Sequence, residues 1–191
     1  MANETANAAS VVRTTESDRS AEAADDVRGS GAPKAEAART HASETEAARA
    51  RAMDEVLGYL THIPAWYLAT IDENDPAQPR VRPFSFAAVD GGKLWFSTSR
   101  DKDVWRELSA NPKFEASGWH PGEGWIVLSG EAVLDDDAVV SDKVRQDGFD
   151  HMMGLGEHHD SPDDGRLAYF SVRDARARFC DIDGNERVVE F

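Results

Sequence analysis

The chain has 191 residues, enough for one domain of ordinary size and an additional tail. Its 36 Asp and Glu residues against 21 Lys and Arg residues give a formal net charge of -15. This acidity disfavours nucleic acid and anionic membranes as general partners, because both bind positive surfaces. The sequence has no apolar run of membrane-spanning length and no secretory signal. With Cys180 as its lone cysteine, we expect a cytoplasmic protein in a reducing setting.

Residues 1–42 differ in composition from the rest of the chain. They are rich in Ala, Glu, Asp, Ser and Thr and contain no aromatic residue, Leu or Ile. Such a segment buries too little apolar area to offset its chain entropy, so we expect a disordered tail. An inert extension and an interaction segment both stay open for it. The folded domain is therefore expected at residues 43–191.

The folded part is expected to begin with a helix. Ser43 and Glu46 form the pattern of a capping box at the start of "SETEAARARAMDEVLGYL". Apolar residues then recur at helical spacing, which predicts an amphipathic helix packed on the strands that follow. These residues are Ala47, Ala50, Met53, Val56, Leu57 and Leu60.

Short strands dominate the remainder. Apolar and β-branched segments bounded by turn residues predict strands at 65–71, 80–89, 93–98, 113–119, 125–134, 167–173, 177–182 and 188–191. Further helices are expected at about 101–110, ending at Asn111-Pro112, and at about 136–146. Many short strands with few helices favour a closed barrel over a doubly wound sheet.

The segment from Pro79 to Pro112 carries the most informative functional pattern. Arg80 and Arg82 lie on one face of its first strand, and its second strand leads into Thr98-Ser99-Arg100-Asp101-Lys102 at the start of a helix. Helix starts favour anions because their first N–H groups lack partners and the macrodipole is positive there. The pattern therefore predicts a phosphate pocket. The alternatives are that the arginines are solvated or pair with carboxylates, and that Thr98, Ser99 and Asp101 cap the helix.

A second segment, "HMMGLGEHHD" at 151–160, contains His151, His158, His159 and Asp160. Adjacent histidines on a loop do not fix a tetrahedral metal site, so we expect no metal there and favour a flexible lid over a ligand groove. The run Asp135 to Asp137 lacks the spacing of a calcium loop and is better explained as an acidic helix start. No hydrolase-type arrangement is evident, so no catalytic residue is assigned.

Four segments in order resemble the pyridoxamine 5'-phosphate oxidase-like family of FMN-binding split barrels, and in particular its small single-domain flavoproteins. They are "WYLATIDENDPAQPRVRPF", "KLWFSTSRDKDVWRELSANPKFEASGW", "GWIVLSGEAV" and "ARARFCDIDGNERVVEF". The resemblance runs from Met53 to Phe191. It implies a mainly β fold, a six-stranded antiparallel split barrel with flanking helices, that forms a homodimer with FMN in a groove between the subunits. Related split barrels use the same groove for deazaflavin or haem, which stay open as alternatives.

The resemblance also implies roles for individual residues. Arg82, with Arg80 as a second candidate, matches the arginine at the FMN phosphate and ribityl chain, and Lys102 matches the phosphate lysine. Trp125 falls beside the isoalloxazine ring, where an indole stacks well. The full set expected at the cofactor is Arg80, Val81, Arg82, Pro83, Ser97, Thr98, Ser99, Lys102, Asp103 and Trp125.

The chain departs from the vitamin-B6 oxidases of this family, which end in a segment with a tryptophan and paired arginines. Here the end is "NERVVEF" and no tryptophan follows Trp125, so pyridoxamine phosphate oxidation is not expected. We expect an FMN-dependent oxidoreductase that uses a small-molecule electron donor or acceptor, with an unidentified substrate. The alternative is a non-catalytic flavin carrier or redox sensor.

Overall fold

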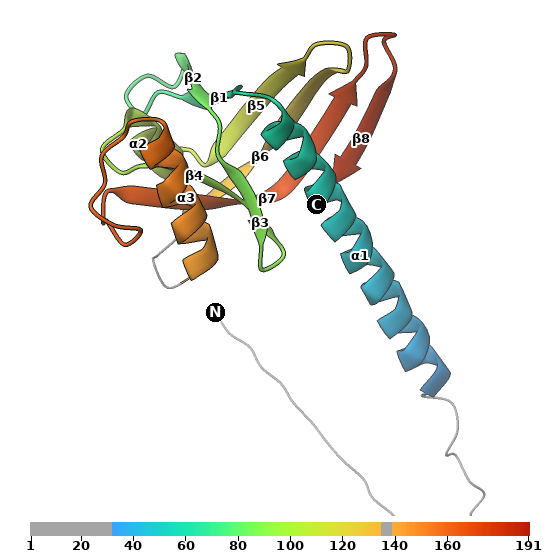
Figure 1. Cartoon of the computed structure of the whole chain (residues 1–191). Helices are drawn as coiled ribbons and strands as arrows, with labels where there is room; N and C mark the ends of the chain where they lie inside the picture. Colours follow the sequence, from blue (N-terminus) through green and yellow to red (C-terminus); the bar gives the residue numbers. More distant parts are fainter. Residues whose placement is uncertain (1–31, 135–138) are drawn as a thin grey trace, which may run out of the picture. The chain divides into compact units, whose positions relative to one another are not determined.

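The computed structural model describes residues 32–134 and 139–191 (Figure 1). Contacts divide the chain into residues 1–38 and 39–191, and the description below concerns the second unit. Its described part consists of one antiparallel sheet and three helices. The elements are α1 (Ala32–His62), β1 (Trp66–Ile71), β2 (Pro79–Phe84), β3 (Ala87–Asp90), β4 (Lys93–Ser99), α2 (Asp103–Ala110), β5 (Lys113–His120), β6 (Gly124–Leu134), α3 (Asp142–Gly154), β7 (Leu167–Cys180) and β8 (Glu186–Glu190).

The sheet has eight strands in the order β2-β1-β5-β6-β7-β4-β3, with β8 paired to β7. Its two outermost strands, β2 and β3, are consecutive in the chain and are separated only by Ser85 and Phe86. The sheet must therefore curl until its ends approach each other. The mainly β, antiparallel fold class expected from the sequence is confirmed. The single predicted strand 80–89 is interrupted at Ser85, whereas the two predicted strands 167–173 and 177–182 form one long strand that bends at Asp174, where φ is 50°.

The concave side of the curled sheet holds the main core. Aromatic rings from β1, β4 and β7 meet there, with ring centroids 4.7 Å apart for Trp66 and Phe96 and 5.4 Å apart for Phe96 and Phe170. Val56 and Leu60 of α1 join this core without exposed surface. Burying each large apolar side chain contributes about 1.5–3 kcal/mol, so this cluster is the main source of stability.

A second apolar cluster joins the outer side of β3, β4 and β7 to α3. Val144 and Met152 lie two helical turns apart on one face of α3 and are buried in it. Gly148, between them, lies against the Tyr169 ring, where an added Cβ would come within 2.6 Å of a ring carbon. The Tyr169 hydroxyl donates a hydrogen bond to the Arg145 carbonyl oxygen at 3.0 Å, and burial raises its pKa to about 12. These contacts fix α3 over this part of the sheet.

The helix boundaries correct several expectations. α1 begins at Ala32 instead of Ser43, and Ala47 and Ala50 are exposed because the buried contacts of α1 begin only at Ala52. α3 begins after Ser141, whose hydroxyl accepts a hydrogen bond from the Val144 N–H, and not near residue 136. It continues to Gly154, so the first four residues of the expected lid loop are helical.

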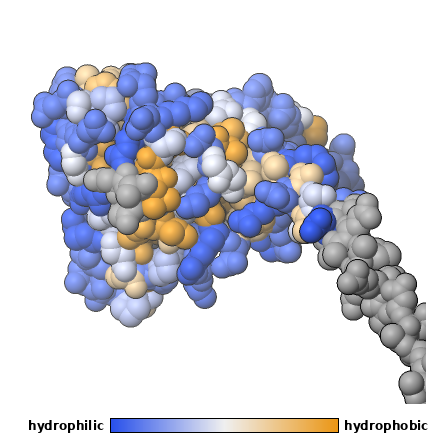
Figure 2. Space-filling model, turned by 90° about the horizontal axis from the view of Figure 1, so that it is seen from below, coloured by the Kyte–Doolittle hydropathy of each residue, from blue (hydrophilic) through white to orange (hydrophobic). Residues whose placement is uncertain are grey.

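The disorder expected for residues 1–42 is wrong for residues 32–42, which belong to α1, and its remainder at 1–31 lies outside the described residues, as does the acidic run at 135–137. Most of the surface visible in Figure 2 is hydrophilic, as expected for a net charge of -15, but hydrophobic side chains gather in a patch on the face shown. Among the described helices, none has the combination of length and apolar character that a bilayer crossing requires.

Candidate functional site

A pocket of about 470 Å³ lies where β2 and β4 meet the start of α2 and the end of α3, and we call it the α2–α3 pocket. Its volume is within the range of small-molecule sites. Five of the residues expected at the cofactor line it, namely Arg82, Pro83, Ser97, Thr98 and Lys102. The structure therefore brings half of the expected site together in one cavity.

The start of α2 forms one end of this pocket. Lys102 occupies the N-cap position in an extended conformation and makes no side-chain capping hydrogen bond. The Ser99 hydroxyl accepts only a long 3.4 Å contact from the Asp101 N–H, and the N–H of Lys102 bonds to the Ser99 carbonyl oxygen. The alternative that serine and threonine hydroxyls cap this helix is therefore wrong, since the start of α2 has no side-chain capping hydrogen bond. An uncapped helix start beside a lysine is suited to an anion.

Two hydroxyl residues at the end of β4 line the pocket and are buried, Ser97 and Thr98. The Ser97 hydroxyl oxygen is buried and has no hydrogen-bond partner among the described residues. Leaving a buried polar group without a partner costs about 1–3 kcal/mol, and such a group needs an explanation. A ligand that accepts a hydrogen bond from Ser97 would supply one.

Arg82 reaches the pocket but is held by an internal network. Its guanidinium contacts the Thr70 hydroxyl and the Glu107 carboxylate, and the Thr70 hydroxyl donates to Glu107 at 2.5 Å. The Glu107 side chain is only 4% exposed and that of Arg82 is 22% exposed. The carboxylate-pairing alternative thus holds for Arg82. A guanidinium has five N–H donors, so the pairing leaves donors for a ligand in the pocket.

Four expected residues of the same segment lie outside this pocket. Arg80 is exposed and pairs with Asp72 at 2.7 Å, and the pKa of Asp72 is lowered first by the Asn74 backbone N–H and then by Arg80. Val81 points to the opposite face of the sheet, and Asp103 pairs with Arg106. Ser99 is buried but does not line the cavity.

The segment after α3 forms the other wall of the pocket. Met152, Leu155 and Glu157 line it, and the Glu157 carboxylate accepts a hydrogen bond from the Lys102 ammonium at 2.5 Å. The segment 151–160 was expected near the ligand groove, and part of it does border this cavity, but His151 and Met152 do so from the last turns of a helix.

Sequence reasoning missed a polar pair in this wall. The Ser85 hydroxyl lies 2.7 Å from Nε2 of His151, and the His151 ring packs against Phe86. Burial lowers the pKa of His151, which favours the neutral imidazole. The break between β2 and β3 exposes the Ser85 hydroxyl to α3, and no local sequence signal marked this contact across 66 residues.

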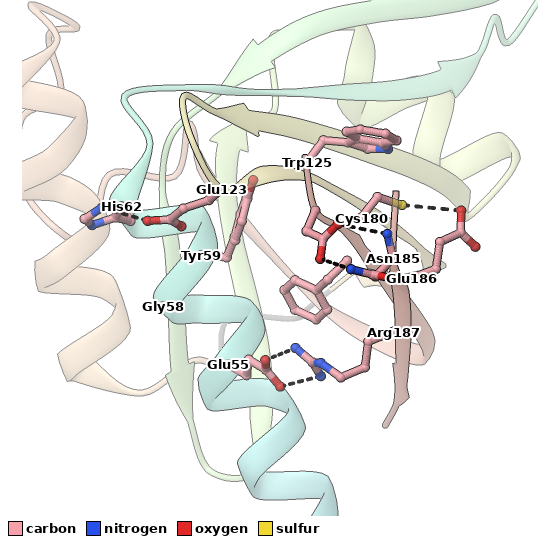
Figure 3. Close-up of a pocket in the computed structure, with 12 residues that line it drawn as sticks. Glu55, Gly58, Tyr59, His62, Glu123, Trp125, Cys180, Asn185, Glu186 and Arg187 are labelled. Atoms are coloured by element: carbon pink, nitrogen blue, oxygen red, sulfur yellow. Dashed lines mark hydrogen bonds and ion pairs between the residues drawn. The ribbon is translucent and has the colours of Figure 1, made fainter. Parts of the chain in front are cut away.

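Trp125 belongs to a different cavity, which we call the α1–β6 pocket (Figure 3). This pocket of about 630 Å³ is bordered by Tyr59 and Glu55 of α1 and by Trp125 of β6, which is 40% exposed. Within one chain, Trp125 therefore does not line the α2–α3 pocket. Cys180 also borders this cavity. It is buried, as expected, and burial raises the pKa of its thiol.

The comparisons with known proteins agree with this architecture. The family model for pyridoxamine 5'-phosphate oxidase matches residues 52–186, more than half of the chain, and the chain belongs to this family. A NimC/NimA family protein from Clostridium acetobutylicum is 29% identical, with a TM-score of 0.65, and the match covers 78% of this chain and 98% of that one. No curated protein matches the sequence.

Two further solved structures support the fold alone. General stress protein 26 from Bacillus anthracis is 14% identical with a TM-score of 0.51, and the match covers 71% of this chain and 97% of that one. A protein from Clostridium acetobutylicum that is related to general stress protein 26 is 16% identical with a TM-score of 0.52, and the match covers 74% of this chain and 96% of that one.

Proposed function

We propose that the chain is an FMN-dependent reductase that binds the cofactor phosphate in the α2–α3 pocket. The observation that carries the proposal is the uncapped start of α2, which lies beside Lys102 and the unpartnered Ser97 hydroxyl in a member of the pyridoxamine 5'-phosphate oxidase family. Bound flavin supplies the hydride or electron transfer, so the protein needs no nucleophile of its own.

The pocket residues fit the two chemical parts of this cofactor. Lys102, the Thr98 and Ser97 hydroxyls and the free donors of Arg82 would hold the phosphate through charge-assisted hydrogen bonds. Phe86, Met152 and Leu155 supply apolar wall for an aromatic ring system. Lys102 would then be shared between the phosphate and Glu157.

We further propose that two copies of the chain pair through the outer face of β2, β1, β5 and β6. Four large apolar residues are exposed on this face, with Val81 64%, Trp119 63%, Tyr67 56% and Trp125 40% exposed. Trp119 and Trp125 are directly opposite each other on neighbouring strands. Exposed aromatic clusters of this kind are typical of interfaces, and in a dimer Trp125 would be part of a groove between subunits.

The dimer is tested by sedimentation of the parent chain and of Trp119→Glu at micromolar concentration. We expect a dimer that buries more than about 1,000 Å² for the parent and a shift towards monomer for the variant, because a carboxylate at the interface loses its hydration. A parent chain that sediments only as a monomer would exclude the dimer.

The cofactor is tested by heating the purified protein and identifying the released chromophore. We expect FMN, and release of a deazaflavin or haem instead would replace the FMN assignment.

Reductase activity is tested by adding NADH or NADPH and then an acceptor under stopped flow. Reduction and reoxidation of the bound flavin over repeated turnovers would support a reductase. A flavin that neither nucleotide reduces would support the carrier or sensor alternative.

A further inference from the structure

Three side chains of metal-ligating type meet where the end of α1 reaches the turn between β5 and β6. His62 comes from the last turn of α1, His120 ends β5 and Glu123 lies in the turn. Their ligand atoms all lie within 4.8 Å of one another. Figure 3 shows His62 and Glu123 pointing towards each other at the edge of the α1–β6 pocket.

The distances in this cluster fit a shared ion better than direct hydrogen bonds. Glu123 Oε1 lies 3.5 Å from His120 Nδ1 and 3.9 Å from His62 Nε2. Hydrogen bonds between such atoms are about 2.7–3.2 Å long. Two ligands of a tetrahedral zinc ion with bonds of about 2.1 Å lie roughly 3.4 Å apart. An ion placed between the three atoms would draw these side chains together, since their ligand atoms lie within 4.8 Å of one another.

His120 gives independent evidence for a ligand at this place. Its Nδ1 atom is buried and has no hydrogen-bond partner within the described residues, although Glu123 is nearby. Buried polar atoms without a partner are rare, and an ion or water is a common explanation. The simplest alternative is a pairing of this imidazole with the Glu123 carboxylate, but at 3.5 Å that pairing makes no hydrogen bond to Nδ1.

The backbone holds the three groups in place. The Tyr59 hydroxyl, one helical turn before His62, donates to the Gly124 carbonyl oxygen at 2.8 Å and so ties α1 to the turn. The Glu123 N–H bonds to the His120 carbonyl oxygen at 3.2 Å. Gly124 has φ of 112°, and an added Cβ would lie 1.9 Å from the Cys180 carbonyl oxygen, so the turn has little freedom. A preformed arrangement lowers the ordering cost of binding an ion.

We propose that His62, His120 and Glu123 form a divalent zinc site with a fourth position open to water or a ligand. Two imidazole nitrogens with one carboxylate oxygen suit zinc, whereas calcium and magnesium prefer oxygen ligands alone. The Asp181 carboxylate also lines the α1–β6 pocket and adds negative charge that attracts a cation, whereas Glu186 is paired with Arg178 at 3.2 Å. None of its ligands lines the α2–α3 pocket, so the zinc site does not depend on the proposed phosphate site.

The test is calorimetric titration of untagged full-length protein with zinc chloride after treatment with a chelator. We expect one zinc ion per chain. His120→Ala and the isosteric Glu123→Gln should each weaken binding at least about tenfold, since losing a direct ligand exceeds the effect of losing a supporting group. His158→Ala, an exposed histidine outside the cluster, is the matched control and should bind like the parent.

Cobalt substitution gives a second readout that does not depend on activity. Co²⁺ in this site should show visible d–d bands that shift or weaken in Glu123→Gln, while far-UV circular dichroism of the variant stays that of the parent. A parent chain that binds no zinc overturns the proposal. The proposal is also overturned if His158→Ala weakens zinc binding while His120→Ala and Glu123→Gln leave it unchanged.

Discussion

The two pockets of the domain differ in the balance of charged side chains that line them. The α2–α3 pocket is lined by two cations, Arg82 and Lys102, and one carboxylate, Glu157, at the positive end of α2, whereas the α1–β6 pocket is lined by four carboxylates and one arginine. The cation in the second pocket, Arg187, is paired with Glu55 at 2.9 Å (Figure 3). A net charge of -15 thus says little about either site. Local arrangement decides which ion each pocket favours, an anion in the first and a cation in the second.

The largest expected effect comes from removing the arginine that lies between the first pocket and the core. Arg82→Ala leaves the Glu107 carboxylate, 4% exposed, without its cation. We expect the free energy of unfolding to fall by about 3 kcal/mol, since breaking a buried pair strands a charge. Urea denaturation at pH 7 measures this.

Arg80→Ala is the matched control for this variant, because it removes the same side chain two residues away. The side chain of its partner Asp72 is 15% exposed and also accepts hydrogen bonds from the Asn74 and Asp75 N–H groups, so the loss should be smaller. Equal losses for the two variants would mean that the Glu107 network does not stabilise the fold.

The next effect tests whether the first pocket selects a phosphate. If Lys102 contacts the FMN phosphate, Lys102→Ala should lose about 1.5–3 kcal/mol of binding, or ten- to over a hundredfold in affinity. Riboflavin, which lacks the phosphate, should bind the parent far more weakly than FMN but should bind parent and variant alike. Fluorescence titration of apoprotein at fixed ionic strength measures both ligands.

Lys143→Ala is the control for charge alone, since Lys143 pairs with Asp147 on the surface of α3 and does not line the pocket. Its affinity for FMN should equal that of the parent. If the parent binds riboflavin and FMN equally well, the start of α2 is not a phosphate site.

Local sequence patterns predicted this first pocket better than the second. Ser97, Thr98 and Lys102 belong to one continuous strand, loop and helix, and the helix ends at Ala110 as Asn111-Pro112 indicated. The alternation of apolar and polar residues, together with the turn residues, was therefore enough to predict this strand, loop and helix start as consecutive elements. The sequence offered the ion pair between Arg82 and Glu107 only as a general alternative of pairing with some carboxylate, because Glu107 lies on another element.

The second pocket depends on contacts between distant segments. His62 and His120 are 58 residues apart in the sequence, and only the packing of α1 against the β5–β6 turn brings them together. The single local signal was the turn "HPGEG", which places His120 and Glu123 three residues apart. The start of α1 was also missed, because a capping box predicts a boundary only when no upstream residues continue the helix.

A smaller effect concerns the support of the first pocket by α3. Tyr169→Phe removes the hydrogen bond to the Arg145 carbonyl oxygen and should lower stability by about 1 kcal/mol at pH 7. The pKa of Tyr169 is raised from 10.0 to about 12 by burial, so the folded state favours the neutral phenol. The resulting stabilisation is complete below pH 10 and is lost as the pH rises from 10 to 12.

The difference in melting temperature between Tyr169→Phe and the parent should therefore shrink over that interval. Thermal melts at pH 8, 10 and 11 measure it. A difference that stays constant with pH would show that Tyr169 ionises as easily in the folded as in the unfolded chain.

The smallest effect is expected from deleting residues 1–42, because both pockets lie in residues 43–191. Arg39, His41 and Ala42 are exposed, and the buried contacts of α1 begin at Ala52. The deletion should therefore leave the melting temperature and the flavin content nearly unchanged. A shorter deletion, of residues 1–31, separates the loss of the tail from the loss of the first turns of α1. A fall of more than about 4 °C, roughly 1 kcal/mol for a domain of this size, would show that the removed segment packs on the domain.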